Sequence, residues 1–233
     1  MSPPLDMIYV HVPKTGGTAI RQALAAQLGE QLLQDYGDSP GDPSSYMNLD
    51  PEGFLRLDHL GKLQGKRAVF GHFWLNKYKD AQAKLRATVL REPVERVISL
   101  YHFWQTTSLP HNAVWRLFRE RRLTLLEFAR LPAMRGNLSA YFFRDVDMRE
   151  FDYVGDHADL ERDWDRVTAR LGLAIPRTIA NRTSDAAPDY ARQAAAVLAD
   201  ASLVDQLRAA LDDDIRFYER WTRTGGGGCQ SSR

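Results

Sequence analysis

The sequence predicts a three-layer α/β/α domain built on a central parallel sheet. Three observations support this class: short β-branched and aromatic runs alternate with amphipathic helical patterns, two of these runs lead through a turn directly into a helix, and no internal repeat divides the 233 residues. Strands that alternate with helices favour a parallel sheet covered on both faces. We expect a single domain over residues 1–224 and a disordered tail over 225–233.

The first strand is expected at residues 7–12, MIYVHV, because β-branched and aromatic residues favour strands. A glycine turn follows, and then a helix over about residues 17–28 with one apolar face, formed by Ile20, Ala23, Leu24 and Leu28. Residues 34–53 are rich in Gly, Pro, Asp and Ser. They predict a long loop, and such loops in compact domains often serve as lids or binding loops.

The rest of the chain continues the alternation. Further strands are expected at residues 67–71, 86–90 and 152–156, and further helices from residue 93, over 112–144, up to 171 and over about 202–221. Pro93 fits the first position of its helix, because a helix leaves that N–H unpaired in any case.

Composition excludes little. A net charge of +1 gives no support to nucleic-acid binding, so acidic groups would have to bind at local clusters. The one cysteine, Cys229, cannot form an internal disulfide, which fits a reducing compartment. The first residues lack a basic region followed by a long apolar run. We therefore expect a cytoplasmic protein without a membrane partner.

Residues 11–18, HVPKTGGT, predict an anion site, because a strand, a glycine turn and a helix N-terminus together present unpaired N–H groups. The groups offered to an anion are the backbone at Gly16 and Gly17, the hydroxyls of Thr15 and Thr18, and the ammonium of Lys14. ATP and GTP loops place their lysine directly after the last glycine, whereas here it comes before the pair. The alternative is a glycine turn that binds nothing.

PKTGGT resembles the 5′-phosphosulfate loop of sulfotransferases that use 3′-phosphoadenosine 5′-phosphosulfate (PAPS). Within that family, HVPKTGGT is similar to the carbohydrate-type branch that includes the heparan sulfate 2-O-sulfotransferases. The resemblance implies a P-loop-like fold, PAPS as co-substrate, 3′-phosphoadenosine 5′-phosphate (PAP) as product, and no metal. It covers roughly residues 7–221.

Residues 88–103, TVLREPVERVISLYHF, resemble the family's 3′-phosphate motif, an arginine at a strand end and a serine eight residues later. This resemblance assigns Arg91 and Ser99 to phosphate binding, and the alternative is an ion pair of Arg91 with Glu92 or Glu95. The family often has aspartate where this chain has Glu92. Glutamate is a poorer N-cap, so a looser helix start is expected.

Two weaker likenesses add residues. NRTSDAAPD (181–189) stands where the family has a loop near the 3′-phosphate, which makes Arg182 and Thr183 further donors unless the loop is merely solvated. RGNLSAYFF (135–143) resembles a segment near the acceptor cleft, which makes Asn137 and Tyr141 acceptor contacts.

Among six histidines, His72 is the candidate general base. It follows Gly71 at the carboxyl end of a predicted strand, the edge where open α/β sheets bind ligands. GHFWLNKYKD (71–80) also resembles the 2-O-sulfotransferase pattern, whose base is the histidine of a Gly-His pair. Lys14 would then stabilise the leaving oxygen. A histidine that only caps the strand is the alternative. The other five have expected places: His59, His111 and His157 in water, His11 beside the loop and His102 in the core.

The acceptor is the least specified part. Trp74 and other aromatic residues near His72 could stack on sugars or could be core. The sequence thus predicts sulfuryl transfer from PAPS to a hydroxyl of a carbohydrate or glycosylated small molecule. The alternatives are a nucleotide-dependent kinase of P-loop type and a non-catalytic protein of the same fold that binds nucleotide or glycan. Lack of an anchor and of paired cysteines departs from Golgi-resident members and points to a bacterial setting.

Overall fold

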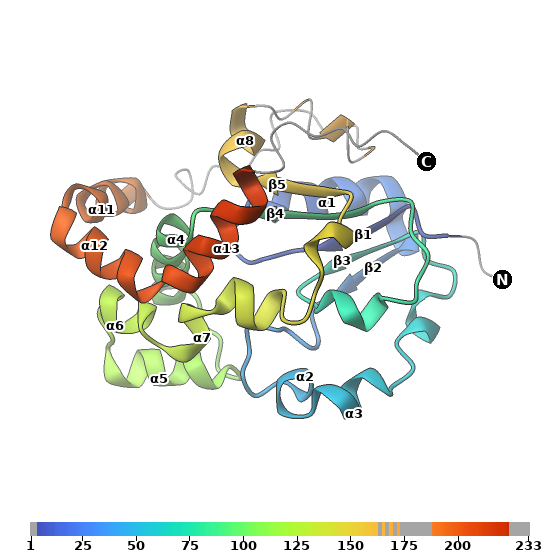
Figure 1. Cartoon of the computed structure of the whole chain (residues 1–233), viewed down its shortest axis with the longest axis horizontal. Coiled ribbons are helices and arrows are strands. Elements are labelled where there is room, and N and C mark those ends of the chain that lie inside the picture. Colours follow the sequence, from blue (N-terminus) through green and yellow to red (C-terminus); the bar gives the residue numbers. More distant parts are fainter. Residues whose placement is uncertain (1–3, 163–164, 166–167, 170–171, 173–187, 224–233) are drawn as a thin grey trace.

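The structure is a computed structural model that describes residues 4–162, 165, 168, 169, 172 and 188–223. The described residues form a five-stranded sheet of order β2-β3-β1-β4-β5, and every neighbouring pair is parallel. The strands are β1 (Met7–Val10), β2 (Leu32–Asp35), β3 (Ala68–Gly71), β4 (Arg86–Leu90) and β5 (Tyr153–Asp156). The predicted class, a parallel sheet between helical layers, is confirmed (Figure 1).

Helices of very different length connect the strands. The longer ones are α1 (Gly17–Leu28), α4 (Pro93–Thr106), α5 (Ala113–Arg121), α11 (Pro188–Ala199), α12 (Ala201–Ala210) and α13 (Asp212–Arg223). The shorter ones are α2 (Tyr46–Leu49), α3 (Pro51–Leu55), α6 (Leu125–Ala129), α7 (Pro132–Arg135) and α8 (His157–Arg162). Single turns complete the set: η1 (Gly29–Gln31), η2 (Leu60–Leu63), η3 (Leu75–Tyr78), η5 (Met148–Glu150) and the π-helical turn η4 (Asn137–Phe142).

Three expectations about these elements need correction. The sequence did not predict β2, and the segment expected as an irregular loop over residues 34–53 contains α2 and the start of α3. The helix expected over 202–221 is two helices that meet at Leu211. The expectation that residues 112–144 are helical is confirmed, since they form three helices and a π-helical turn. The expected tail over 225–233 and Cys229 lie outside the described residues.

Side chains that alternate along the strands make two cores. On one face, Tyr9 of β1 and Phe70 of β3 pack against Ile20 and Leu24 of α1. On the other face, Ile8 and the buried residues around it pack against the turns η3 and η4 and against the helix α13. The period of two along each strand is what separates these faces.

A helical lobe stands beside the sheet, at the left of Figure 1. Its apolar interior joins α4, α5, α6, α7 and α12, with Trp104, Phe118 and Phe128 in mutual ring contact. Within the part of the chain that the structure describes, no helix has the length and apolarity needed to cross a bilayer.

Because all five strands are parallel, their carboxyl ends share one edge of the sheet. The segments that follow β1, β3 and β4 at this edge begin at His11, His72 and Arg91. The segments after β2 and β5 begin at Tyr36 and His157. This edge is where ligands bind in open α/β sheets, so the fold brings five chemically useful side chains to one region.

Candidate active site

The turn between β1 and α1 has the backbone shape of an anion site. Lys14 and Gly16 adopt left-handed conformations, with φ of 69° and 81°. The buried Thr15 hydroxyl donates to the carbonyl of Val12 at 2.8 Å and so fixes the turn from inside. Gly16 is the N-cap of α1 and has no side chain to pair with the first helical N–H groups. Those groups remain available to a ligand anion.

Glycine at position 17 is required by a neighbour. A Cβ on Gly17 would collide with the imidazole of His11, which comes from the strand side of the same turn. The expectation that His11 packs beside the loop is therefore confirmed. Any larger residue at position 17 would have to displace this ring.

Two cations lie beside the turn. The Lys14 ammonium sits over the Phe103 ring, 4.7 Å from its centroid, and burial together with the nearby Arg91 lowers its pKa. Arg91 Nη1 donates to the Lys14 carbonyl at 3.4 Å, and its Nε lies 3.4 Å from the Glu95 carboxylate. The Arg91 side chain is 16% exposed. The alternative pairing with Glu95 thus exists, but at a length that leaves most of the donors of Arg91 for a ligand.

The start of α4 is better fixed than its sequence indicates. The Glu92 carboxylate accepts the backbone N–H of Glu95 at 2.8 Å, which is a regular N-cap bond. The expected looseness of this helix start is wrong, because the longer side chain still reaches its partner. Ser99 lies two turns further along the same helix.

Ser99 is 2% exposed, and its Oγ has no hydrogen-bond partner among the described residues. A buried hydroxyl without a partner costs free energy, so a ligand oxygen that reached it would recover that cost. Arg182 and Thr183, the further donors expected at this site, lie outside the described residues.

His72 stands after β3 inside a set of rings. Its centroid is 4.8 Å from His11, 4.7 Å from Tyr36 and 6.3 Å from Phe142. Burial lowers the pKa of His72 to about 4, so the imidazole is neutral near pH 7. Its Nε2 is buried and has no partner within the described chain. The ring therefore has a nitrogen whose hydrogen-bonding capacity is not used within the described chain.

His11 is neutral for the same reason. Burial lowers its pKa well below the usual value, and His72, Arg21 and Lys14 act in the same direction. Its Nδ1 is also buried without a partner in the part of the chain described. Two neutral imidazoles thus face each other between the anion turn and Tyr36.

Buried ion pairs anchor the segment that carries Tyr36. Lys77 of η3 contacts the carboxylates of Asp35 at 2.7 Å and Asp38 at 3.1 Å, and its side chain is fully buried. The Tyr78 hydroxyl donates to Asp35 at 2.8 Å. Because these contacts join the ends of β2 and β3, they hold Tyr36 beside His72, although its side chain stays partly exposed. Sequence reasoning missed Tyr36, since it did not predict the strand that precedes it.

The three residues expected to contact the acceptor differ in their burial and in their hydrogen bonds. Trp74 is 3% exposed, donates from its indole to the Arg144 carbonyl at 2.6 Å and packs with Met47, so it presents no face to a saccharide. That expectation is corrected in favour of core packing. Asn137 is 3% exposed and donates to Ala133, while its Oδ1 has no partner among the described atoms. Tyr141 is half-buried on η4.

Two histidines that we expected to be exposed to water are buried or half-buried. His59 is 5% exposed, and its Nε2 lies 2.7 Å from the Phe54 carbonyl. His157 is half-buried at the end of β5, where burial and the charge of Arg91 lower its pKa to about 4. The signal for His157 was present in the sequence, because it follows a predicted strand just as His72 does.

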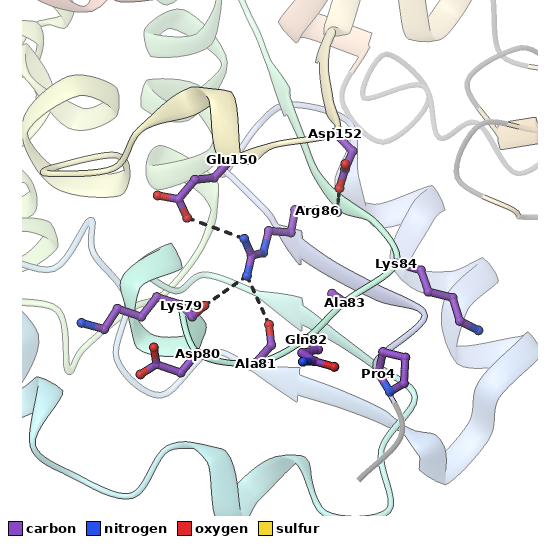
Figure 2. A pocket seen from close by; sticks show the side chains of 10 residues that line it. All are labelled: Pro4, Lys79, Asp80, Ala81, Gln82, Ala83, Lys84, Arg86, Glu150 and Asp152. Carbon is purple, nitrogen blue, oxygen red and sulfur yellow. Dashed lines mark hydrogen bonds and ion pairs between the residues drawn. The ribbon is translucent and has the colours of Figure 1, made fainter. Parts of the chain in front are cut away.

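A hollow of 540 Å³ lies at the amino-terminal ends of the strands, where β4 begins (Figure 2). Its central cation is Arg86, which donates to the carbonyls of Lys79 and Ala81 and lies 3.6 Å from Glu150. The guanidinium is thus occupied by the protein itself. This hollow is remote from the anion turn and adds no group to the site.

The residues that the structure describes include no group of three or more His, Cys, Asp or Glu side chains placed to hold a metal ion.

Comparisons with known proteins identify the family. Among solved structures, the chain is similar to a sulfotransferase from Alicyclobacillus acidocaldarius, with 18% identity and a TM-score of 0.42 over 94% of this chain and 100% of that one. It is also similar to mouse sulfotransferase SULT7A1 in complex with PAP, with 15% identity and a TM-score of 0.37 over 83% of this chain and 65% of that one. None of the curated proteins matches. The model of the sulfotransferase family matches residues 1–133, more than half of the sequence, and the chain belongs to this family.

Proposed function

We propose that this sulfotransferase transfers the sulfuryl group of PAPS to a hydroxyl of a carbohydrate or glycosylated small molecule, with His72 as general base. One observation carries the proposal. Lys14, Arg91 and His72 follow three adjacent strands and lie at one edge of the sheet, cations on one side and a neutral imidazole on the other.

The residues at this edge fit a ligand with two separate anionic groups. Lys14 and the N–H groups at Gly16 and Gly17 would hold the 5′-phosphosulfate, and the exposed Thr18 hydroxyl would add a donor. The Thr15 hydroxyl already donates to Val12, so this residue would contribute its backbone N–H.

Arg91 and Ser99 would hold the 3′-phosphate. A guanidinium binds phosphate with paired N–H groups, and the buried Ser99 hydroxyl needs a partner. We place Arg182 and Thr183 at the same phosphate as further donors. ATP has no phosphate at this position, so the second group is what would distinguish the two nucleotides.

His72 would take the proton of the acceptor hydroxyl as that oxygen attacks, and would later release it to water. When bound, PAPS supplies the sulfuryl group: the bond from the acceptor oxygen to sulfur forms while the bond from sulfur to the 5′-phosphate oxygen breaks. Lys14 would neutralise the charge that develops on that phosphate oxygen. The negative charge near His72 raises the pKa of the imidazole above its value in the free protein, which makes it a stronger base in the complex.

The acceptor would enter between the segment after β2 and η4. Tyr36 is 38% exposed and meets His72 edge to face, so its own ring and hydroxyl remain partly accessible. On η4 we assign the half-buried Tyr141 to the acceptor, together with Asn137, whose buried Oδ1 has no partner among the described atoms. Aromatic faces with a few hydroxyl and amide partners suit a sugar ring, which supports the carbohydrate acceptor.

Calorimetric titration with PAP and with ATP, both without magnesium, tests donor recognition. We expect PAP to bind more tightly, since ATP leaves Arg91 and Ser99 without the second phosphate. Equal affinity for the two nucleotides, or no binding of PAP, would end the proposal.

Labelled PAPS offered with a panel of saccharides and phenols tests the acceptor class. We expect transfer to a saccharide hydroxyl. Transfer to phenols alone would refute the carbohydrate assignment and leave the sulfotransferase assignment standing.

A further inference from the structure

His157 lies against the anion turn, although it comes from the far side of the sheet. It is the first residue of α8, directly after β5. A Cβ placed on Gly16 would be 3.3 Å from the imidazole Cδ2 and 3.6 Å from its Nε2. An anion seated on the N–H groups at the start of α1 would therefore meet this ring.

Two charged groups of the described chain act on His157, and they come from the ends of two neighbouring strands. Among the described residues, Arg91 at the end of β4 and Asp156 at the end of β5 act on it with opposite signs. The Asp156 carboxylate is itself engaged, because it accepts the Tyr218 hydroxyl of α13 at 2.6 Å and the Ala158 backbone N–H at 3.0 Å. Burial is the main cause of the lowered pKa of His157 and the charge of Arg91 adds to it, so the free site disfavours a protonated imidazole.

We infer that His157 binds the donor nucleotide and takes up a proton when a phosphate group occupies the turn beside Gly16. The inference rests on the proposed function, since the ligand is the phosphate of PAPS or PAP. An anion near the ring would counteract burial and the charge of Arg91, because it stabilises the imidazolium. The turn would then present a third cation, formed only in the complex, next to Lys14 and Arg91.

This coupling makes donor affinity depend on pH. In the free protein the pKa of His157 is about 4, and in the complex it lies higher. At a pH between these two pKa values, His157 is protonated in the complex but not in the free protein. Affinity therefore rises as pH falls through this window, by up to about tenfold per pH unit. Above the pKa in the complex, the contribution disappears.

The test measures PAP affinity by calorimetry from pH 5 to pH 8 for the full chain, for His157→Gln and for His111→Gln. Glutamine keeps a hydrogen-bonding group but cannot be protonated, and His111 is exposed and serves as the control. The phosphates of PAP titrate in the same range but do so identically for all three proteins. The ratio of wild-type to variant affinity thus isolates His157.

We expect this ratio to be within about twofold of unity at pH 8 and to reach at least about tenfold at pH 5.5 for His157→Gln. It should stay flat for His111→Gln. Titrations in two buffers of different ionisation enthalpy should show proton uptake on PAP binding that is smaller in His157→Gln than in the wild type.

A ratio that is independent of pH, with equal proton uptake in both proteins, would overturn the inference while PAP binding itself upholds the proposed function. Failure of wild-type PAP binding would instead remove the proposed function. Thermal unfolding of each variant shows whether it is folded, and His157→Asn provides a second neutral replacement if the glutamine does not fit beside Leu160.

Discussion

Replacement of His72 by alanine should remove most of the turnover and little of the donor affinity. Loss of a general base reduces turnover by about 10²–10⁴-fold, or roughly 3–5 kcal/mol of activation free energy. The groups that we propose to bind phosphate, in the turn and on α4, do not depend on this ring, so PAP should bind the variant nearly as well as the wild type.

The burial of His72 also leads to a prediction for the pH dependence of the reaction. Burial lowers the pKa of His72 from 6.5 to about 4, a penalty of about 3 kcal/mol on the protonated form. The neutral ring is the active form. In the free enzyme, kcat/KM should therefore fall as pH decreases through about 4, rather than through 6.5. In the donor complex the pKa is higher, so kcat should begin to fall at a higher pH.

Initial rates with labelled PAPS and an acceptor that the wild type sulfates, measured from pH 4 to pH 8, check both statements. PAP calorimetry on the same samples separates binding from turnover, and His111→Ala is the matched control on an exposed histidine. Turnover within about tenfold of the wild type in His72→Ala would refute the assignment of the base, because it falls below the range for general-base loss.

Arg91→Ala should weaken PAP binding by about 1–3 kcal/mol in calorimetry, whereas the exposed Arg121→Ala should not change it. Asp214→Ala should lower the free energy of unfolding by about 3–5 kcal/mol in denaturant titration. The reason is that this buried carboxylate accepts two backbone N–H groups of η4 and lies 4.0 Å from the buried Arg96. A loss of stability no larger than that of the exposed Asp213→Ala would contradict this. Neutral buried imidazoles also make folding sensitive to acid. Since their pKa values are lowered in the fold, stability should decline as pH falls from 6.5 towards 4, and an unfolding midpoint that is unchanged between pH 7.5 and pH 5 would exclude this effect.

Most of the fold could be predicted because its signals are local. Four of the five strands are compact apolar runs next to turns or helix starts. The strand β2 escaped prediction because LLQD has only two apolar residues, neither β-branched nor aromatic, before the chain continues into polar sequence. Such a strand depends on its partner β3 more than on its own propensity.

The break at Leu211 could not be predicted from periodicity. Leu203, Leu207, Leu211 and Ile215 continue one helical stripe across it, so the pattern alone indicates a single helix. The structure begins a new helix at the acidic run 212–214, where Asp214 turns inward to accept N–H groups of η4. That is a tertiary contact with a segment about 75 residues earlier, and no local pattern contains it.

The candidate site likewise combines features of continuous segments, which the sequence can indicate, with contacts between distant segments, which it cannot. The anion turn and the start of α4 are continuous segments, so their residue order was enough to place Lys14 and Arg91. The contacts of His72 with His11 and Tyr36 join three strands and appear only in the folded chain. Trp74 could not be assigned from sequence, because an aromatic residue beside a base suits a core as well as a sugar platform.

Near the carboxyl ends of the strands, buried polar atoms without a hydrogen-bond partner lead to a last prediction. Ser99 Oγ, His72 Nε2 and His11 Nδ1 come from different elements, and none has a partner among the described residues. Each such group destabilises the free protein by about 1–3 kcal/mol unless something pairs with it. If a ligand phosphate pairs with Ser99, then Ser99→Ala should leave the free energy of unfolding unchanged or higher, yet weaken PAP binding. A structural hydroxyl would behave in the opposite way, with lower stability and unchanged PAP affinity. Denaturant titration and calorimetry on this one variant therefore tell a binding hydroxyl from a packing one.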